Sequence, residues 1–160
     1  MSLRVGLGYD IHRTIINRPL VLGGVHIDSD WGLDGHSDAD VLLHAIGDAL
    51  LGAAGLGDLG EHFPPSDAQW KDVSSLLLLG RIAVLLRERG ATIANVDGML
   101  IAEAPKIAPH RDEMRANIAT ALDVPIDRVS IKATTNEQLG ALGRAEGLAA
   151  MAVALVDVGP

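Results

Sequence analysis

The sequence has no cysteine, very few aromatic residues and no excess of positive charge. Without cysteine the chain can form neither disulfide bonds nor thiolate metal sites, so any zinc must be bound by histidine and carboxylate groups. Two tryptophans, one tyrosine and one phenylalanine are too few for a surface that stacks many bases or sugars. The formal net charge of -8 argues against a broad nucleic-acid-binding surface, and a polyphosphate ligand would need bound cations or backbone N–H groups.

Long hydrophobic runs are also missing. The apolar stretch at residues 148–156 is too short to cross a bilayer, and no secretion signal precedes the first predicted strand. The length of 160 residues and the hydrophobic content of 48% favour one folded domain over residues 1–160. We therefore expect a single-domain cytoplasmic protein that binds neither membranes nor nucleic acids.

Strand and helix patterns alternate along the chain, which predicts an α/β or α+β fold with a mixed sheet. Strands are expected at residues 3–9, at 19–27 with a break at Gly23 and Gly24, and at 92–102, 129–134 and 148–158. Helices are expected at residues 38–54, 73–89 and 109–122. Ser37 or Asp38 could cap the first helix. The last strand is apolar on both faces, so it is either central in the sheet or covered by a partner subunit.

A candidate metal site comes from Asp10, His12 and His44. One carboxylate and two imidazoles form the ligand set of a catalytic zinc site with an open fourth position. Asp40 and Asp48 lie four residues to either side of His44, where a carboxylate could fix the imidazole tautomer. Two alternatives stay open at this point: the residues around His44 could form an ordinary solvated helix face, and Asp10-Ile11-His12 could form a turn.

Two further segments could bind phosphate or a second cation. His36 and Ser37 precede a helix, whose N-terminal N–H groups favour an anion. Residues 132–137 combine hydroxyl groups with Glu137, a carboxylate that suits a hard cation such as Mg²⁺. A helix cap and a polar turn would explain the same residues, and the glycines around Arg144 do not have the spacing of a P-loop or a dinucleotide fingerprint.

Taken together, these segments resemble the 2-C-methyl-D-erythritol 2,4-cyclodiphosphate synthases over essentially the whole chain. The matching stretches are Gly8-Tyr9-Asp10-Ile11-His12, Leu22-Gly23-Gly24-Val25, residues 35–44, residues 48–54, Gly57-Asp58-Leu59-Gly60, Phe63-Pro64, Ala104-Pro105-Lys106, Lys132-Ala133-Thr134-Thr135, Glu137, Gly143-Arg144 and Glu146-Gly147. So many ordered motifs are very unlikely to agree by chance.

The resemblance implies a lyase that acts in non-mevalonate isoprenoid precursor biosynthesis. The 2-phosphate of 4-diphosphocytidyl-2-C-methyl-D-erythritol 2-phosphate would attack the β-phosphate, forming 2-C-methyl-D-erythritol 2,4-cyclodiphosphate and releasing CMP. The implied assembly is a homotrimer with active sites at the subunit interfaces. Each α/β (α+β) subunit would have a mixed sheet, helices on one face and a ferredoxin-like βαβ arrangement.

The resemblance also assigns roles to individual residues. Zn²⁺ would be bound by Asp10, His12 and His44, a second cation (Mg²⁺ or Mn²⁺) by Glu137, and the transition state would be stabilised by His36 and Thr135. Substrate contacts are implied for Ser37, Asp58, Leu59, Gly60, Phe63, Asp67, Ala102, Ala104, Pro105, Lys106, Ile107, Ala108, Ala133, Thr134, Ala141 and Arg144. Residues 102–108 would form the loop around cytosine.

Two other functions remain open from the sequence. A metal-dependent phosphohydrolase would use the same cations but deliver water, and would yield inorganic phosphate or a hydrolysed product. A non-enzymatic trimeric metal-binding protein would show no turnover at all. The identity of the phosphorus-containing product separates these functions from a cyclising enzyme.

Overall fold

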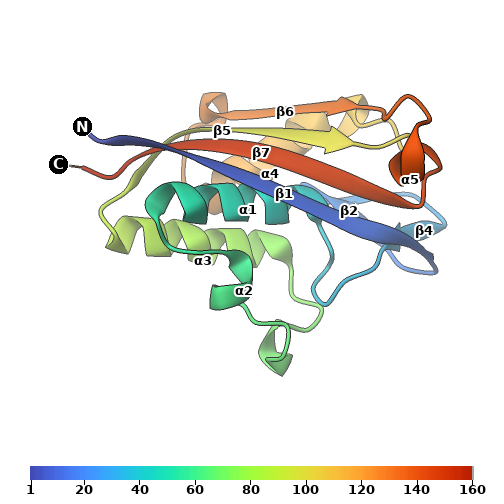
Figure 1. Ribbon diagram of the computed structural model, residues 1–160, viewed down its shortest axis with the longest axis horizontal. Coiled ribbons are helices and arrows are strands. Elements are labelled where there is room, and N and C mark those ends of the chain that lie inside the picture. The colour runs from blue at the N-terminus through green and yellow to red at the C-terminus, as the bar shows by residue number, and fades with distance from the viewer. Residues whose placement is uncertain (160) are drawn as a thin grey trace.

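A five-stranded mixed sheet forms one layer of the computed structural model, which describes residues 1–159. Its strands lie in the order β4 (Trp31–Leu33), β1 (Leu3–Ile16), β7 (Gly147–Asp157), β5 (Thr92–Ile101) and β6 (Val129–Thr134) (Figure 1). Only β5 and β6 pair in parallel; the other neighbours are antiparallel. The apolar strand β7 is therefore central in the sheet, which is the first of the two predicted explanations.

The pairing of β1 with β7 runs without interruption from Leu3 opposite Asp157 to Arg13 opposite Gly147. Alternate residues of β1 face opposite sides of the sheet. On one side, Gly6, Gly8, Asp10 and His12 face the helices and are buried or half-buried. The neighbouring residues of the strand are exposed on the other side, so the register decides which side chains reach the interior.

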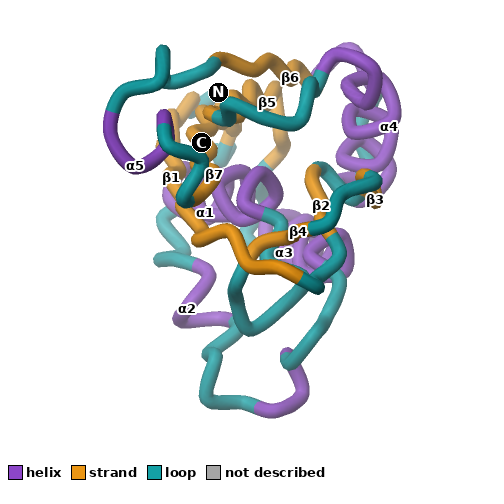
Figure 2. Tube along the Cα trace, turned by 90° about the vertical axis from the view of Figure 1, so that its right-hand side faces the viewer, coloured by secondary structure: helices purple, strands orange, loops and turns teal. Residues whose placement is uncertain are grey.

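Three long helices lie on one face of the sheet: α1 (Val41–Ala54), α3 (Ser75–Glu88) and α4 (Arg111–Leu122). The short helix α2 (Leu59–His62) follows α1, and α5 (Gly140–Gly143) lies beside β7 on the other side of the sheet (Figure 2). Short 3₁₀ turns occur at Ala68–Trp70, Ala108–His110 and Ile126–Arg128. Figure 1 shows α1 directly beneath β1 and β7, with α3 farther from the sheet. None of the helices in the described part of the chain has the length and apolar character needed to span a membrane.

A separate hairpin is formed by β2 (Leu20–Leu22) and β3 (Val25–Ile27). Gly23 and Gly24 form its two-residue turn with φ angles of 58° and 73°, a conformation that glycine adopts readily. Figure 2 shows this hairpin beside α4, where Asn117 Nδ2 donates to the Gly23 carbonyl at 3.3 Å. The sequence predicts one broken strand here, and the structure shows two antiparallel strands.

The sheet and α1 approach each other very closely. A Cβ added to Gly6 would lie 1.9 Å from the Ala49 oxygen, and one added to Gly8 would lie 1.8 Å from the Ala45 oxygen. Only glycine can occupy these two positions of β1 without moving the helix. The close approach brings the α1 backbone, and with it His44, next to the strand that carries Asp10 and His12.

The opposite face of the sheet is open and apolar. Large hydrophobic side chains are exposed along β1 and β7: Leu3, Val5, Leu7, Tyr9, Ile11, Met151 and Val153. We call this set the open apolar face. A face of this kind is typical of a surface that another protein covers.

Several predicted boundaries differ from those in the structure. β1 continues to Ile16, because residues 10–13 still pair with β7 and residues 14–16 pair with the unpredicted strand β4. Helix α1 begins at Val41, so the prediction that Ser37 or Asp38 caps it is wrong. Asp40 is the cap, and its side chain accepts a hydrogen bond from the Leu43 N–H. The short helices α2 and α5 were not expected.

Candidate metal and substrate site

Three predicted metal ligands meet where β1 lies against α1. Asp10 Oδ2 lies 2.9 Å from His12 Nε2 and 3.0 Å from His44 Nδ1, and the two nitrogens are 3.2 Å apart. Zinc bonds of about 2.0–2.1 Å to nitrogen and oxygen place tetrahedral ligand atoms about 3.3 Å apart. These three atoms thus have nearly the spacing of one face of such a tetrahedron, and among the described residues they form a group that could hold a metal ion.

The electrostatics of the three side chains also suit a cation. Burial alone would raise the pKa of Asp10, but its contacts with His12 and His44 outweigh that effect and lower it. Burial alone would lower the pKa of His12, yet the hydrogen bond and charge of Asp10 raise it. Positive charge is therefore favoured at this point, whether it is carried by a proton or by a metal ion.

Contacts behind the ligands orient the two imidazole rings. His12 Nδ1 donates to the Asp34 carbonyl at 2.6 Å, which leaves Nε2 free to bind a metal. His44 Nε2 lies 3.0 Å from Ser37 Oγ and 2.9 Å from Ser75 Oγ, on the side of the ring away from Asp10. The polar groups around both rings thus match those of a metal-binding histidine.

The carboxylates predicted to orient His44 bind elsewhere. Asp40 accepts hydrogen bonds from the N–H groups of Gly23, Gly24 and Leu43, and Asp48 accepts one from Leu59 N at 2.8 Å. Burial, and secondarily the charge of Asp38, raises the pKa of Asp40 to about 6. The prediction that Asp40 and Asp48 contact the imidazole of His44 is therefore wrong, because their groups fix the hairpin and α2 instead.

A pocket of about 210 Å³ opens beside the three ligands. Its lining includes the predicted residues His36, Ser37, Leu59, Gly60 and Phe63 together with His12 and His44, and three unpredicted residues, Pro65, Trp70 and Leu78. The aromatic rings of Phe63 and Trp70 pack edge-to-face with centroids 5.1 Å apart. We call this space the triad pocket.

Two residues predicted to contact substrate in this region cap short helices in the structure. Asp58 caps α2 by accepting from Glu61 N at 3.0 Å, and Asp67 caps the following 3₁₀ turn by accepting from Gln69 N at 3.0 Å. Neither residue lines the triad pocket. Trp70 was missed because an isolated aromatic residue carries no periodic signal.

A second pocket, of about 280 Å³, is lined by most of the residues predicted to contact the nucleotide. It is lined by Ala102, Pro105, Lys106, Ile107, Ala108, Ala133, Thr134 and Thr135, and also by Glu103 and Arg111. Ala104 lies outside this lining, against a different hollow near Trp31. We call this space the loop pocket, because residues 102–108 form one wall of it.

A tight turn follows β6 at the edge of the loop pocket. Glu137 and Gln138 have positive φ angles of 52° and 60°, and Thr135 Oγ1 lies 3.4 Å from Glu137 Oε1. Glu103 Oε1 supports the turn by accepting from Asn136 N at 2.9 Å and Gln138 N at 3.1 Å. No pattern in the sequence singles out Glu103, since its contacts lie more than thirty residues away along the chain.

The two pockets lie at the same end of the sheet but apart within one chain. Ile11 is opposite Ala149, Ala149 is opposite Ile101, and Ile101 is opposite Thr134. Three steps of about 4.8 Å between strands separate β1 from β6 by about 14 Å. Glu137 accordingly does not belong to the Asp10–His12–His44 group. Ala141 and Arg144 line neither pocket; Arg144 Nε pairs with Glu146 at 2.7 Å.

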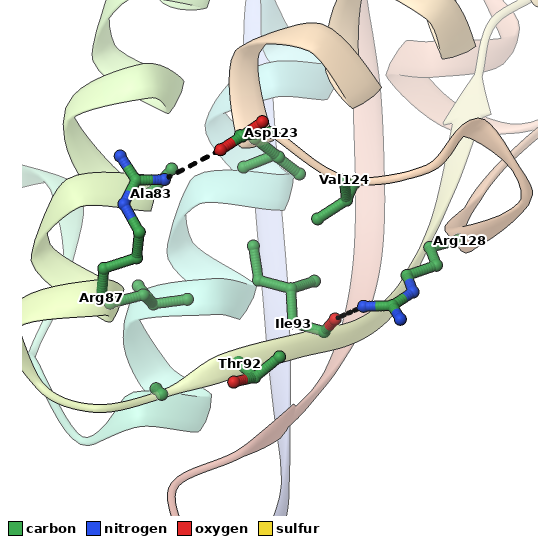
Figure 3. A pocket seen from close by; sticks show the side chains of 10 residues that line it. Ala83, Arg87, Thr92, Ile93, Asp123, Val124 and Arg128 are labelled. Atoms are coloured by element: carbon green, nitrogen blue, oxygen red, sulfur yellow. Dashed lines mark hydrogen bonds and ion pairs between the residues drawn. The ribbon is translucent and has the colours of Figure 1, made fainter.

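A further pocket of about 240 Å³ lies between the ends of α3 and α4 and the start of β5 (Figure 3). Its charged groups are engaged: Arg128 donates to the Ile93 carbonyl at 2.9 Å, and Arg87 lies 3.9 Å from Asp123. None of the predicted site residues lines it.

The chain is similar to known proteins over nearly its whole length. The YgbB family matches residues 3–157. The 2-C-methyl-D-erythritol 2,4-cyclodiphosphate synthase of Thermosynechococcus vestitus is 55% identical over 159 residues, which cover 99% of both chains. The Akkermansia muciniphila enzyme of that name is 60% identical over 157 residues, covering 98% of this chain and 93% of that protein. A solved structure, the Plasmodium falciparum IspF CDP complex, is 34% identical with a TM-score of 0.85 and covers 97% of this chain and 96% of that one. The chain therefore belongs to the YgbB family.

Proposed function

We propose that this chain converts 4-diphosphocytidyl-2-C-methyl-D-erythritol 2-phosphate into 2-C-methyl-D-erythritol 2,4-cyclodiphosphate and CMP. The observation that carries the proposal is the meeting of Asp10, His12 and His44 beside the triad pocket. The nearly full-length similarity to curated cyclodiphosphate synthases gives the reaction. The product serves non-mevalonate isoprenoid biosynthesis, and the enzyme is a phosphorus–oxygen lyase.

The metal part of the proposal assigns Zn²⁺ to Asp10, His12 and His44. Two imidazoles and one carboxylate would hold the ion and would leave it free to polarise a phosphate group of the substrate. Glu137 is proposed to bind a second cation, Mg²⁺ or Mn²⁺, because an exposed carboxylate suits a hard ion. Cations held at these two places supply positive charge that offsets repulsion between phosphate groups.

The rest of the chain positions a reaction that needs little covalent help. Attack by a phosphate tethered to its own electrophile removes an entropic barrier of up to about 7–11 kcal/mol. His36 and Thr135 are proposed to stabilise the transition state. His36 lines the triad pocket and Thr135 lines the loop pocket, so each would act from one of the two proposed substrate pockets. A phosphate dianion is already a nucleophile, so no general base is required.

Substrate recognition is proposed to divide between the two pockets. Ser37, Leu59, Gly60 and Phe63, with Asp58 and Asp67, would contact the erythritol phosphate. Ala102, Ala104, Pro105, Lys106, Ile107, Ala108, Ala133 and Thr134 would hold the cytidine diphosphate, with Ala141 and Arg144 nearby. The lining of the loop pocket and the CDP complex of the Plasmodium falciparum relative support this division.

We also propose that the chain acts as a homotrimer with its active sites between subunits. Two observations support this: the open apolar face of β1 and β7, and the distance of about 14 Å between strands that carry the two pockets. A partner subunit would let one copy's triad pocket meet another copy's loop pocket. The parallel β5–α4–β6 unit supports the predicted ferredoxin-like βαβ arrangement of a single-domain subunit.

The decisive experiment is a product assay by ³¹P NMR. Purified protein loaded with zinc and Mg²⁺ is given the diphosphocytidyl substrate, and we expect the cyclic diphosphate together with CMP. Inorganic phosphate or an open-chain phosphate would instead identify a phosphohydrolase. No turnover at all would leave a metal-binding protein without this activity. His44→Ala, which removes one proposed ligand, serves as the inactive control.

A further inference from the structure

We propose that Asp38 and Ser75 are positioning residues that fix the tautomer of His44, so that His44 Nδ1 is free to bind a metal. The proposal rests on the proposed metal site and deepens it. It replaces Asp40 and Asp48, which do not contact the imidazole, with a pair of residues from two other segments. Ser75 is the first residue of α3, and Asp38 lies in the loop before α1.

The contacts form a chain from a carboxylate to the imidazole. Ser75 Oγ lies 2.9 Å from His44 Nε2 and also hydrogen-bonds to Asp38 Oδ1. The other carboxylate oxygen, Asp38 Oδ2, accepts from Ser75 N at 2.9 Å. Ser75 is only 1% exposed, so water does not compete for these bonds.

The direction of each hydrogen bond follows from the number of protons available. An ionised carboxylate only accepts, so the single hydroxyl proton of Ser75 must point to Asp38. The oxygen of Ser75 then faces His44 Nε2 as an acceptor, and Nε2 must carry the ring proton. A neutral imidazole protonated at Nε2 has its lone pair at Nδ1, the atom that faces Asp10 and His12.

Ser37 cannot set this direction alone. Its Oγ lies 3.0 Å from His44 Nε2 and accepts from Ala39 N at 3.2 Å. No carboxylate hydrogen-bonds to Ser37 Oγ among the described residues, so its hydroxyl proton can turn toward the imidazole or away from it. Because the Ser75 hydroxyl donates its proton to the Asp38 carboxylate, the Ser75 oxygen can only accept a hydrogen bond from His44 Nε2.

A purely structural role for Asp38 makes different predictions. Ser74, the residue before α3, forms no side-chain cap, and Asp38 accepts the N–H of Ser75 in its place. If capping α3 were its only role, changing Asp38 would lower the free energy of unfolding and leave metal affinity unchanged. A role through His44 requires metal affinity to fall.

The test uses the full-length chain and measures zinc affinity by competition with a chromophoric chelator. Asp38→Asn supplies one oxygen where two acceptors are needed, so its NH₂ group either faces the Ser75 N–H or donates to Ser75 Oγ and turns the hydroxyl proton toward His44. We expect Asp38→Asn and Ser75→Ala each to weaken zinc binding by about 10- to 100-fold, the usual loss for a partner of a ligand. Asp72→Asn and Ser74→Ala, at exposed neighbouring positions, should bind zinc as the unaltered protein does.

A second readout is the tautomer itself. Asp10 Oδ2 lies 3.0 Å from His44 Nδ1 and could itself accept the ring proton, so the ¹⁵N NMR spectra are recorded at pH 8 on the metal-free Asp10→Ala variant. His44 should be protonated at Nε2 in that variant, and adding Asp38→Asn should shift the proton toward Nδ1. Zinc affinity within twofold of normal in both Asp38→Asn and Ser75→Ala, or an unchanged tautomer on adding Asp38→Asn, would overturn the proposal. If the unaltered protein did not bind zinc, both this proposal and the proposed metal site would be wrong. Normal zinc binding without cyclic product would refute the proposed function alone.

Discussion

Gly8 of β1 lies directly against Ala45 of α1, so closely that a Cβ on Gly8 would be 1.8 Å from the Ala45 oxygen. Ala45 is the neighbour of His44, and Gly8 precedes Asp10 by two residues on the same face of β1. The gap between strand and helix therefore sets the distance between the metal ligands of the two elements.

We expect Gly8→Ala to destabilise the protein and to weaken zinc binding, because α1 must move away from β1. Overpacking of this kind costs about 1–3 kcal/mol or more. Urea unfolding and chelator competition measure the two effects. Gly52→Ala on α1 is the control, because a Cβ at this position meets nothing within 4 Å. This variant should raise the free energy of unfolding by about 0.5–1 kcal/mol. Normal zinc affinity in Gly8→Ala would show that this packing does not control the site.

Glu103 should be needed for an acceptor oxygen rather than for its charge. A single atom, Oε1, accepts from both Asn136 N and Gln138 N, so Glu103→Gln can keep both bonds. Glu103→Leu leaves two amides of the turn without their partner, a loss of about 1–3 kcal/mol for each that stays buried. Steady-state kinetics should show an increase in KM of about tenfold or more for Glu103→Leu and near-normal values for Glu103→Gln. Equal impairment of both variants would assign the effect to charge.

Arg18 holds the segment before α1 by two carbonyl groups. Its Nη1 donates to Gly35 O at 2.8 Å, and its Nη2 donates to Ser37 O, so both sides of His36 are fixed. Lysine cannot donate to two carbonyls with the same planar fork. We expect Arg18→Lys to lower kcat by about tenfold with little change in the free energy of unfolding. Arg81→Lys, at an exposed position on α3, should have normal kcat; equal rates in the two variants would contradict a role for Arg18.

Asp40 should make stability depend on pH between its unfolded and folded pKa values. The pKa rises from 3.8 to about 6 in the folded chain, chiefly through burial. The folded state then binds the proton more tightly, so stability falls as pH rises through this interval. Between pH 5 and pH 7 the loss should be about 1 kcal/mol.

Asp40→Asn removes this titration, and the difference between the two proteins isolates it from that of other groups. Urea unfolding at pH 5 and pH 7 provides the four free energies. A difference between the two proteins that stays constant across the two pH values would show that Asp40 keeps its ordinary pKa when folded.

The open apolar face should be required for assembly. Leu7 is 64% exposed on β1 opposite Val153, and Leu7→Lys places a charge in the middle of that face. We expect light scattering to give a trimer mass for the unaltered protein, a monomer mass for Leu7→Lys, and loss of cyclic product in the variant. Leu77→Lys, at a 48% exposed leucine on α3, should remain trimeric and active. A monomeric and active unaltered protein would refute the proposed assembly.

The sequence predicted the regular elements well and the local contacts poorly. α3 and α4 start within two residues of the expected positions and end within one, because the hydrophobic period is clear in a long helix. β6 has the expected bounds. β4, α2 and α5 contain three or four residues, which is too short for any period to appear. The strand predicted at residues 3–9 ends seven residues before β1 does, because the polar residues that follow resemble a loop in isolation.

The candidate site shows the same division. Its three candidate metal ligands were predicted from residue type and order, and the structure places them together. The partners of His44 could not be found this way, because Ser75 and Asp38 meet it through the packing of α3 against the loop before α1. Spacing within α1 pointed to Asp40 and Asp48, but a carboxylate near a histidine along a helix is free to bind backbone groups elsewhere.

The register between β1 and β7 decides whether Asp10 and His12 lie on the same side of the sheet as His44. A slip of one residue would turn Asp10 and His12 to the open apolar face and turn Tyr9 and Ile11 toward α1. His44 would then lie on the other side of the sheet from both partners. A chain that binds zinc through all three side chains has thereby paired its longest strands correctly, so metal binding would select the right strand pairing from nearby misfolded alternatives.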